Sequence, residues 1–494
     1  MKIKKILVAN RGEIALRVQK TAREMGISVV TVYAEDDKHL PHALYADESY
    51  SLGSGTLADT YLNKAKLIEI AKKSNADAIH PGYGFLSENE EFARLVETNG
   101  IIFIGPTPES IVLMGDKIGS KKALEKISIP LTPGYHGDDQ SDENLMIEAK
   151  KIGYPVLIKA SAGGGGKGMR IVHQDAELLE SIRGAKSEGL KSFSSDKVLI
   201  EKYVVNPRHI EVQLMSDTHG NHLHFFEREC SIQRRYQKVV EETPAPNMSQ
   251  ELRMKICETA VQIAKGINYR GAGTVEFILA QDGNYYFMEM NTRLQVEHPV
   301  TEMVTGHDLV KHQIMVAQGE KLPVQQTDIK QKGSAIECRI YAEDPDNNFM
   351  PTIGRIEKIG VPTLRDVRLD CGFLDGTVVG VNYDPMLAKL VVWGEDRKTA
   401  ISKTIQSLDE VLFLGVKTNC DYLKRILGHQ QFVEGKVHTH FIPDHKEDLK
   451  PKSLRDDELA AMIAAFNFSE GKAARVSGFE TLKNPWTELT GFRN

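Results

Sequence analysis

The chain has 494 residues, of which 41% are hydrophobic and 26% charged, and its formal net charge is −6. These values are ordinary for a globular protein of roughly two to four domains, and the charge gives no reason to expect a nucleic-acid or membrane partner. The five cysteines are far apart and include no CxxC pair, which favours reduced thiols over a zinc site. No segment approaches the about 18 apolar residues of a membrane span, and the N-terminal apolar run is too short for a signal peptide. We therefore expect a cytoplasmic protein.

The first part of the chain alternates short apolar runs with helical patterns. Strands are expected at residues 4–10, 28–34, 77–82 and 100–106, and helices at 11–26, 62–75 and 89–99. This rhythm predicts an open, mostly parallel α/β sheet. Ligands bind at the carboxyl ends of strands in such sheets, so the loops ANRGE (9–13) and HPGYGFLSE (80–88) are candidates for lining a site.

The pattern changes near Pro130. The polar stretch 132–144 is typical of a hinge, and we interpret residues 131–203 as a small mobile domain with a helix and three strands, interrupted by the polar piece 187–196. Antiparallel strands are expected after it, at 209–217, 221–229, 273–280 and 284–291. A linker (323–333), a further α+β block to about residue 443 and a charged tail follow.

The stretch KASAGGGGKGMR (159–170) is typical of a phosphate-binding loop. It cannot be a Walker A loop, because Gly168 follows Lys167 where Ser or Thr is needed. The extended segment after it excludes a dinucleotide fingerprint, which would lead into a helix. A glycine loop between two strands can act as a flap over phosphates, as in protein kinases, but neither HRD nor DFG is present. The simpler alternative is a surface hairpin, although four consecutive glycines carry a large entropy cost.

The segment 273–298 predicts a metal site. If Asp282-Gly283 forms a two-residue hairpin turn, Glu276 lies directly opposite Glu289. Like charges at that spacing destabilise a sheet unless a cation lies between them. Period-two alternation puts a set of polar side chains on one face while the strand stays extended: Glu289, Asn291, Arg293, Gln295 and Glu297. Carboxylate and amide oxygens suit Mg²⁺, and the alternative is a solvated sheet face with incidental acids.

These features resemble the ATP-grasp superfamily, and a series of motifs resembles the biotin carboxylase family from about Lys4 to Pro443. The motifs are ANRGEIA, HPGYGFLSEN, MGDK, IKASAGGGGKGMR, RHIEVQ, ERECSIQRR, FMEMNTRLQVEHPVTE, ECRIYAEDP and YDPMLAKL. The resemblance implies an α/β and α+β fold with an N-terminal Rossmann-like domain (1–115) and an ATP-grasp domain (116–325) that includes the lid (131–203). A C-terminal biotin carboxylase domain (333–443) and a charged tail (444–494), interpreted as the start of a linker, would follow.

The resemblance also implies roles for individual residues. ATP contacts are expected from Lys117, Lys159, Gly164, Gly165, Gly166, Glu201, Lys202, His209, Gln233, Tyr236, Glu276 and Glu289. Two Mg²⁺ or Mn²⁺ ions would be held by Glu276, Glu289 and Asn291. Bicarbonate would be bound by Lys238, Arg293, Gln295 and the backbone of Val296. The expected catalytic residues are Glu297 as general base, Arg293, Lys238, and Arg339 on the ureido oxygen of biotin.

Some of these assignments depend on the resemblance alone. A lone lysine at a strand end, the Glu201–Lys202 pair and a lone arginine on a strand are otherwise more often solvated or in surface ion pairs. Tyr236 departs from the family pattern, in which a histidine near the ribose occupies this position.

The expected activity is ATP-dependent carboxylation of biotin by bicarbonate through carboxyphosphate. The only internal Met-Lys pair, Met254-Lys255, lies in an expected helix, so biotin should be attached to a carrier protein on another chain, with a carboxyltransferase subunit as further partner and a homodimer implied. The segment 483–494 resembles that of α subunits of acyl-CoA carboxylases, as in fatty acid biosynthesis, although pyruvate carboxylase is an alternative. Two competing functions are a different carboxyphosphate-forming ATP-grasp ligase, such as half of a carbamoyl phosphate synthetase, and a non-catalytic ATP-sensing subunit.

Overall fold

The N-terminal region is a parallel sheet covered by helices. The computed structural model describes residues 2–161, 169–193 and 195–451. The strands β1 (Lys5–Val8), β2 (Ser28–Ala34), β3 (Glu48–Gly53), β4 (Ala78–His80) and β5 (Ile102–Phe103) pair in the order β3-β2-β1-β4-β5, all parallel. The helices are α1 (Gly12–Glu24), α2 (Pro41–Leu44), α3 (Lys64–Lys73), α4 (Glu90–Thr98) and α5 (Pro108–Gly115). The predicted parallel sheet is confirmed, but β3 was missed because this half-exposed edge strand has no apolar run.

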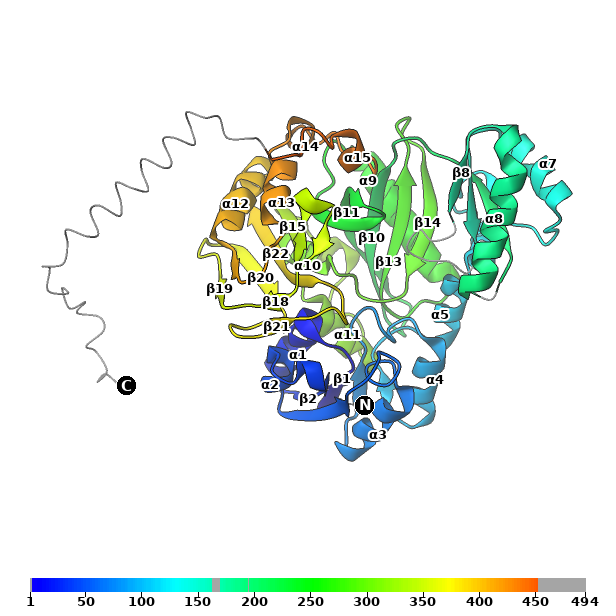
Figure 1. Cartoon of the computed structure of the whole chain (residues 1–494). Helices are drawn as coiled ribbons and strands as arrows, with labels where there is room; N and C mark the ends of the chain where they lie inside the picture. Colours follow the sequence, from blue (N-terminus) through cyan, green and yellow to red (C-terminus); the bar gives the residue numbers. More distant parts are fainter. Residues whose placement is uncertain (1, 162–168, 194, 452–494) are drawn as a thin grey trace, which may run out of the picture. The chain divides into compact units, whose positions relative to one another are not determined.

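The lid is a small sheet with two helices against it. Its strands β6 (Gly134–Tyr135), β7 (Val156–Ala160), β8 (Arg170–Val172) and β9 (Val198–Lys202) pair in the order β6-β9-β7-β8, and α7 (Asp142–Ile152) and α8 (Asp175–Phe193) lie at the right of Figure 1. The strands on either side of the glycine stretch, β7 and β8, are antiparallel neighbours, as the flap interpretation requires. The polar piece 187–196 was expected to interrupt the block, but α8 continues through it to Phe193. The predicted ATP contacts Gly164, Gly165 and Gly166 lie outside the described residues.

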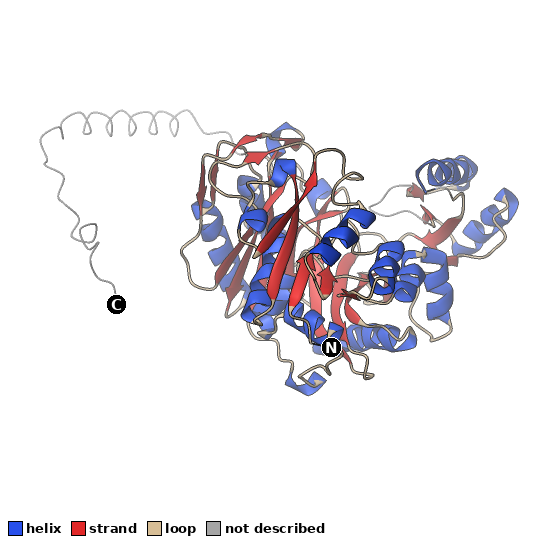
Figure 2. Cartoon of the chain, turned by 90° about the horizontal axis from the view of Figure 1, so that it is seen from below, coloured by secondary structure: helices blue, strands red, loops and turns tan. Residues whose placement is uncertain are grey.

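A single eight-stranded sheet joins the predicted ATP-grasp and C-terminal domains. Its order is β14-β13-β10-β11-β12-β15-β22-β20. The strands are β10 (Arg208–Ser216), β11 (His222–Arg234), β12 (Gln237–Thr243), β13 (Gly271–Leu279), β14 (Tyr285–Asn291), β15 (Ser334–Tyr341), β20 (Val367–Cys371) and β22 (Met386–Gly394). Strand β12, which was not expected from the sequence, pairs antiparallel with β15 and so continues the sheet past the linker at 323–333. Figure 2 shows these long strands in red among the blue helices.

The two faces of this sheet have different chemistry. Ile210, Val212 and Leu214 of β10 pack in one core with α9 (Gln250–Gly266), so strand alternation sends His209 and Glu211 to the opposite face. In the same way, apolar residues of β15 and β22 pack on α12 (Arg397–Glu410), while α10 (His298–Thr305) covers the other face. On the face opposite these two cores, polar side chains that include His209, Lys238, Glu276 and Arg339 line the floor of the site.

The remaining elements are short or peripheral. They are α6 (Lys117–Glu125), α11 (Leu309–Ala317), α13 (Cys420–Leu427), α14 (Gln430–Val433), α15 (Phe441–Asp444), β16 (Glu343–Asp344), β17 (Met350–Pro351), β18 (Gly354–Arg355), β19 (Lys358–Gly360), β21 (Val378–Val379) and β23 (Leu412–Leu414). Within the described ranges, no helix combines the length and the apolar character that crossing a bilayer requires.

The turn between β13 and β14 differs from the prediction. The amide of Ala280 donates to the carbonyl of Asn284 at 2.8 Å, and that of Gly283 donates to the carbonyl of Ala280 at 3.1 Å. The turn therefore has three residues between its paired ends, and Gly283 adopts φ 86°. This arrangement is a preferred three-residue hairpin, in which glycine supplies the left-handed position. The predicted two-residue turn is wrong.

The predicted pairing of Glu276 with Glu289 is nevertheless confirmed. Phe277 lies opposite Phe287, so Met288 is an extra residue on β14 and forms a bulge. The bulge shifts the register by one residue and compensates for the longer turn. Two local features therefore combine to place the two carboxylates face to face.

Candidate active site

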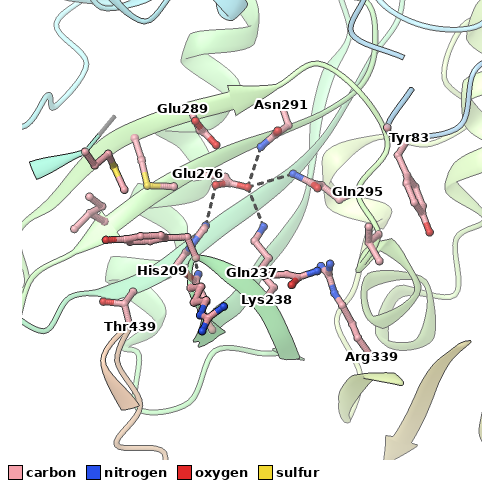
Figure 3. A pocket seen from close by; sticks show the side chains of 18 of the residues that line it. Tyr83, His209, Gln237, Lys238, Glu276, Glu289, Asn291, Gln295, Arg339 and Thr439 are labelled. Carbon is pink, nitrogen blue, oxygen red and sulfur yellow. Dashed lines mark hydrogen bonds and ion pairs between the residues drawn. The ribbon is translucent and has the colours of Figure 1, made fainter. Parts of the chain in front are cut away.

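A cavity of about 960 Å³ lies between the lid, the polar face of the large sheet and the N-terminal loops. Both candidate loops line it, with Asn10 to Glu13 from one and Tyr83 to Phe85 from the other, which confirms their predicted position. Most of the predicted site residues line the same cavity: Lys117, Lys159, Glu201, Lys202, His209, Gln233, Tyr236, Lys238, Glu276, Glu289, Asn291, Arg293, Gln295, Val296 and Arg339. Figure 3 looks into this cavity.

A row of three carboxylates crosses the floor of the cavity. Glu211 of β10 lies opposite Glu276 of β13, which lies opposite Glu289 of β14. Burial and the like charge of Glu276 raise the pKa of Glu289 above its usual range. The amide nitrogen of Asn291 donates to Glu276 at 2.9 Å, as Figure 3 shows. Two opposed carboxylates beside an amide side chain offer the oxygen ligands that a hard divalent cation such as Mg²⁺ prefers.

The carboxylate of Glu276 also forms ion pairs with His209 and Lys238. Its carboxylate oxygens lie 3.0 Å from Nε2 of His209 and 2.9 Å from Nζ of Lys238. Burial acts to raise the pKa of Glu276, but Lys238 and His209 outweigh it and hold that pKa below its usual range. Burial likewise acts to lower the pKa of His209, and Glu276 reverses this and raises it. Gln233 contacts the other ring nitrogen of His209 at 2.7 Å. The imidazole therefore has a fixed orientation at the edge of the acidic row.

Lys238 and Glu297 form the centre of the buried ion network. Nζ of Lys238 lies 2.6 Å from Glu297, 2.6 Å from Glu211 and 2.9 Å from Glu276. Arg339 contacts Glu297 at 2.9 Å and Glu241 at 2.6 Å. Burial acts to raise the pKa of Glu297, but Lys238, Arg339 and Arg228 outweigh it, and that pKa is far below its usual range. Glu297 is therefore an ionised carboxylate that lies behind Lys238 and Arg339 and has no exposed surface.

The segment after Asn291 leaves the sheet. β14 ends there, so the expectation that the strand stays extended to Glu297 is wrong. The side chains still converge, because Arg293 donates to Asn291 at 2.9 Å and to Gln295 at 2.8 Å, and Gln295 donates to Glu276 at 3.2 Å. Arg293 also reaches Glu88 of the HPGYGFLSE loop at 2.8 Å. Side-chain hydrogen bonds replace the sheet in holding this segment over the acidic row.

A second charge cluster lies between the lid and α6. Lys121 and Lys159 each lie 2.5 Å from a carboxylate oxygen of Glu201, which is buried. Burial acts to raise the pKa of Glu201, but the two lysines outweigh it and lower that pKa to about 2. Nζ of Lys202 donates to the backbone carbonyls of residues 153 and 154. Burial lowers the pKa of Lys117 below its usual range. The Glu201–Lys202 segment is thus anchored, in contrast to an exposed surface pair.

Tyr236 lies at the tip of the β11–β12 hairpin. Gln233 pairs with Lys238, so Arg235 and Tyr236 form a two-residue turn, with φ values of 51° and 66°. Both central residues of such a turn need positive φ, a conformation that non-glycine residues seldom adopt. Tyr236 is 62% exposed at the wall of the cavity. The turn therefore presents the Tyr236 side chain to the cavity at some cost in backbone strain.

Two acidic members of the network, Glu211 and Glu241, were not predicted from the sequence. Glu211 has no exposed surface and pairs with Arg228 at 2.5 Å as well as with Lys238. A usable signal was present, since period-two alternation in RHIEVQ puts Glu211 on the same face as His209. Glu241 lies on β12, which was not expected as a strand, so no such signal existed for it.

Known protein families match all three regions of the chain. The family model "Biotin carboxylase, N-terminal domain" matches residues 2–111, "Carbamoyl-phosphate synthase L chain, ATP binding domain" matches 116–325, and "Biotin carboxylase C-terminal domain" matches 337–444. The biotin carboxylase of Allochromatium vinosum is 48% identical, over 89% of this chain and 98% of that protein. The chain belongs to the biotin carboxylase family. Members of this family are ATP-dependent ligases with a three-domain ATP-grasp architecture, as the sequence motifs implied.

Longer relatives and solved structures agree with this membership. Methylcrotonoyl-CoA carboxylase subunit alpha of Dictyostelium discoideum is 50% identical over 99% of this chain, which spans 70% of that protein's length. The biotin carboxylase domain dimer of the Hydrogenobacter thermophilus 2-oxoglutarate carboxylase, in complex with MgADP, ADP and bicarbonate, is 45% identical. It superposes with a TM-score of 0.88 and covers 92% of this chain and all of that domain. As a member of this family, the chain carries out ATP-dependent carboxylation of biotin with bicarbonate, with ATP and Mg²⁺ as cofactors.

Proposed function

We propose that Glu297 is the general base of this biotin carboxylase and that Lys238, Arg293, Gln295 and the Val296 backbone bind the bicarbonate. The observation that carries the proposal is the double contact of Glu297 with Lys238 and Arg339 beside the acidic row. A carboxylate kept ionised at neutral pH can accept the bicarbonate proton. Lys238 and Arg339 can each exchange a carboxylate contact for the substrate, which would bring bicarbonate against Glu297.

The proposed reaction forms carboxyphosphate, lets it decompose and then carboxylates biotin. Glu297 takes the bicarbonate proton, and the bicarbonate oxygen attacks the γ-phosphorus of ATP, forming carboxyphosphate and releasing ADP. Lys117 and Lys159 offset the charge on the phosphates, and Glu276, Glu289 and Asn291 would hold cations that add to this effect. Carboxyphosphate decomposes to CO₂ and phosphate, and the phosphate takes the N1′ proton of biotin. The biotin enolate, steadied by Arg339, attacks CO₂ to give carboxybiotin.

The lid carries some of the proposed nucleotide contacts. Lys159 and Glu201 lie on adjacent strands, so the lid carries a pre-formed ion cluster to the phosphate end of ATP. His209, Gln233, Lys202 and Tyr236 line the wall that would face the base and ribose. Closure of the lid would keep water from carboxyphosphate, which is short-lived in solution.

A bicarbonate-dependent ATP-cleavage assay with free biotin tests this function. Wild-type protein should release phosphate when Mg²⁺, ATP and bicarbonate are present, and free biotin should increase the rate. The middle domain matches a carbamoyl-phosphate synthase family model, so a parallel assay is run with ammonia in place of biotin. Stimulation by ammonia and none by biotin would contradict the proposal. No ATP cleavage in either assay would favour a non-catalytic subunit.

A second proposal concerns the proteins that act together with this chain. We propose an acyl-CoA carboxylase system with the biotin carrier and the carboxyltransferase on other chains, and a homodimer of this chain. The methylcrotonoyl-CoA and propionyl-CoA carboxylase subunits among the relatives support the acyl-CoA class, and the dimer of the H. thermophilus domain supports the second copy. All five cysteines lie in the described ranges and are free thiols, which supports a reducing compartment such as the cytosol. Identification of the biotinylated protein that co-purifies with the chain would test this assignment.

A further inference from the structure

Lys389 is a fully buried lysine in the YDPMLAKL motif, to which the mechanism gives no role. It lies on β22, directly opposite Arg339 of β15, and it has no exposed surface. A buried ammonium group is costly unless several partners satisfy it. Its contacts therefore indicate what keeps it in place.

The ammonium nitrogen of Lys389 donates to the backbone carbonyl of Val296 at 2.8 Å. That carbonyl belongs to the peptide bond that leads into Glu297. The same nitrogen lies 3.2 Å from Glu13 of α1 and 5.7 Å from the ring centroid of Tyr83. One charged group from the C-terminal region thus joins the N-terminal helix, the HPGYGFLSE loop and the segment that carries the proposed base.

The segment around Val296 needs such a partner. It follows Asn291, where β14 ends, so no neighbouring strand pairs with its carbonyls. The carbonyl of Gln295 accepts a hydrogen bond from the ring of His298 at 2.7 Å, and the carbonyl of Val296 accepts one from Lys389. Two buried side chains thus replace the missing sheet hydrogen bonds, and an unsatisfied carbonyl at this depth would be costly.

Acidic groups surround Lys389 on its other sides. Asp370 of β20 is its second cross-strand neighbour, and Glu337 lies on the same face of the sheet. Among the described residues, neither carboxylate oxygen of Glu337 has a hydrogen-bond partner. Burial raises the pKa of Glu13 to about 6 and that of Glu337 far above its usual range, with Lys389 opposing both shifts. The charge of Lys389 therefore has a stabilising role that must be separated from its contact with Val296.

We propose that Lys389 is a positioning residue for bicarbonate: it fixes the Val296–Glu297 peptide through the Val296 carbonyl and so sets the place of the base and of the bicarbonate cradle. This inference rests on the proposed function of Glu297 and Val296. Displacement of reacting groups by about 1 Å can cost about a hundredfold in rate. Loss of the Lys389 contact should therefore act on bicarbonate and leave nucleotide binding alone, because Lys389 does not touch the lid.

The main test compares Lys389→Met with the wild type in steady-state assays of ATP cleavage. The KM for bicarbonate should rise about tenfold or more, as expected for loss of one charge-assisted hydrogen bond. The KM for ATP should stay within about twofold, since the lid contacts are intact. The matched control is Lys403→Met, because Lys403 donates to the carbonyl of Trp393 on the same strand at 2.9 Å, away from the cavity. The control should keep the wild-type KM for both substrates.

A double variant separates positioning from charge. Lys389→Met leaves Glu13 without its cation, so a lowered melting temperature would be expected for that reason alone. Glu13→Gln combined with Lys389→Met removes the buried charge, and it should recover most of the melting temperature while keeping the raised KM for bicarbonate. If Lys389→Met fails to fold, the double variant provides the measurement.

The results distinguish the two proposals. Recovery of both the melting temperature and the KM for bicarbonate in the double variant would overturn the positioning role, as would an unchanged KM for bicarbonate in folded Lys389→Met. An equal rise in the KM for ATP would also overturn it, because general loss of structure would then explain the result. Wild-type protein that cleaves ATP without any dependence on bicarbonate would instead contradict the proposed function.

Discussion

Lys238 and Glu297 lie 2.6 Å apart in an ion pair whose carboxylate has no exposed surface, and the same ammonium group also reaches Glu211 and Glu276. One lysine thus links the proposed base to the acidic row that suits a metal ion. Binding of a cation to Glu276 would remove one of these contacts and release Lys238 towards an incoming anion. Metal binding and bicarbonate binding are expected to favour one another for this reason.

Replacement of the proposed base should abolish most of the chemistry. Glu297→Gln is expected to lower kcat for bicarbonate-dependent ATP cleavage by about 10²- to 10⁴-fold, the usual contribution of a general base. Nucleotide binding, measured by calorimetry with ADP, should persist. The matched control is Glu242→Gln, because Glu242 is a buried glutamate paired with Arg397 at 2.6 Å, outside the lining of the cavity. Activity of Glu297→Gln near the wild-type level would refute the assignment.

The opposed carboxylates should determine the metal requirement. Glu289→Gln is expected to raise the Mg²⁺ concentration for half-maximal activity by about tenfold, and to shrink the rise in melting temperature that Mg²⁺ causes together with ADP. Because the pKa of Glu289 is raised, wild-type affinity for Mg²⁺ should fall as the pH is lowered, when protons compete for this carboxylate. Calorimetric titrations at several pH values would measure the effect. A Mg²⁺ response that is identical in both proteins would exclude Glu289 as a ligand.

Arg339 should matter for biotin more than for ATP. Arg339→Met is expected to raise the KM for free biotin at least about tenfold, by loss of a charged hydrogen-bond donor. It also leaves Glu241 and Glu297 without a shared cation, so unfolding should become easier by about 3–5 kcal/mol. Arg339→Lys retains the charge and should recover the stability more than the KM, because lysine lacks the planar guanidinium group. An unchanged KM for biotin in either variant would be inconsistent with the role.

The lid should lose stability in acid through Glu201. The pKa of this carboxyl is about 2 in the folded chain, below its ordinary 4.5, so its ion pairs stabilise the lid fully above about pH 4.5. That stabilisation, about 3 kcal/mol from the shift, should be lost as the pH falls from about 4.5 through about 2. Hydrogen exchange of the β7 and β9 amides at pH 6 and pH 3 would measure it. Glu201→Gln should show a smaller difference between the two pH values, and an equal difference would argue against this origin.

The tyrosine at the hairpin tip should be replaceable. Tyr236→His restores the residue usual in the family, at an exposed position whose backbone strain is the same for both side chains. The KM for ATP is expected to change less than about threefold, and the free energy of unfolding by less than about 0.5 kcal/mol. Steady-state kinetics and denaturant titration check both values. A tenfold change in the KM would mean that the tyrosine itself contacts the nucleotide.

The β13–β14 hairpin illustrates how far local sequence rules reach. The assumed two-residue turn predicted that Glu276 and Glu289 face each other, and this pairing is correct although the turn was assigned one residue too short. The bulge at Met288 compensated, and nothing in the local pattern identifies it. Turn length and bulge position depend on how both strands pack against β10 and the core below, which a single hairpin sequence does not contain.

The sequence by itself determined the parallel N-terminal sheet, the strands around the glycine stretch and the polar face of the β13–β14 hairpin, because period and turn residues act over a few neighbouring positions. Only the tertiary structure decided which of these faces meet. Lys238, Glu297 and Lys389 are separated by many residues, and they converge because β12 pairs with β15 and continues one sheet across two sequence blocks. Strand order follows from packing of the whole core, so a buried network of this kind becomes visible only in the folded chain.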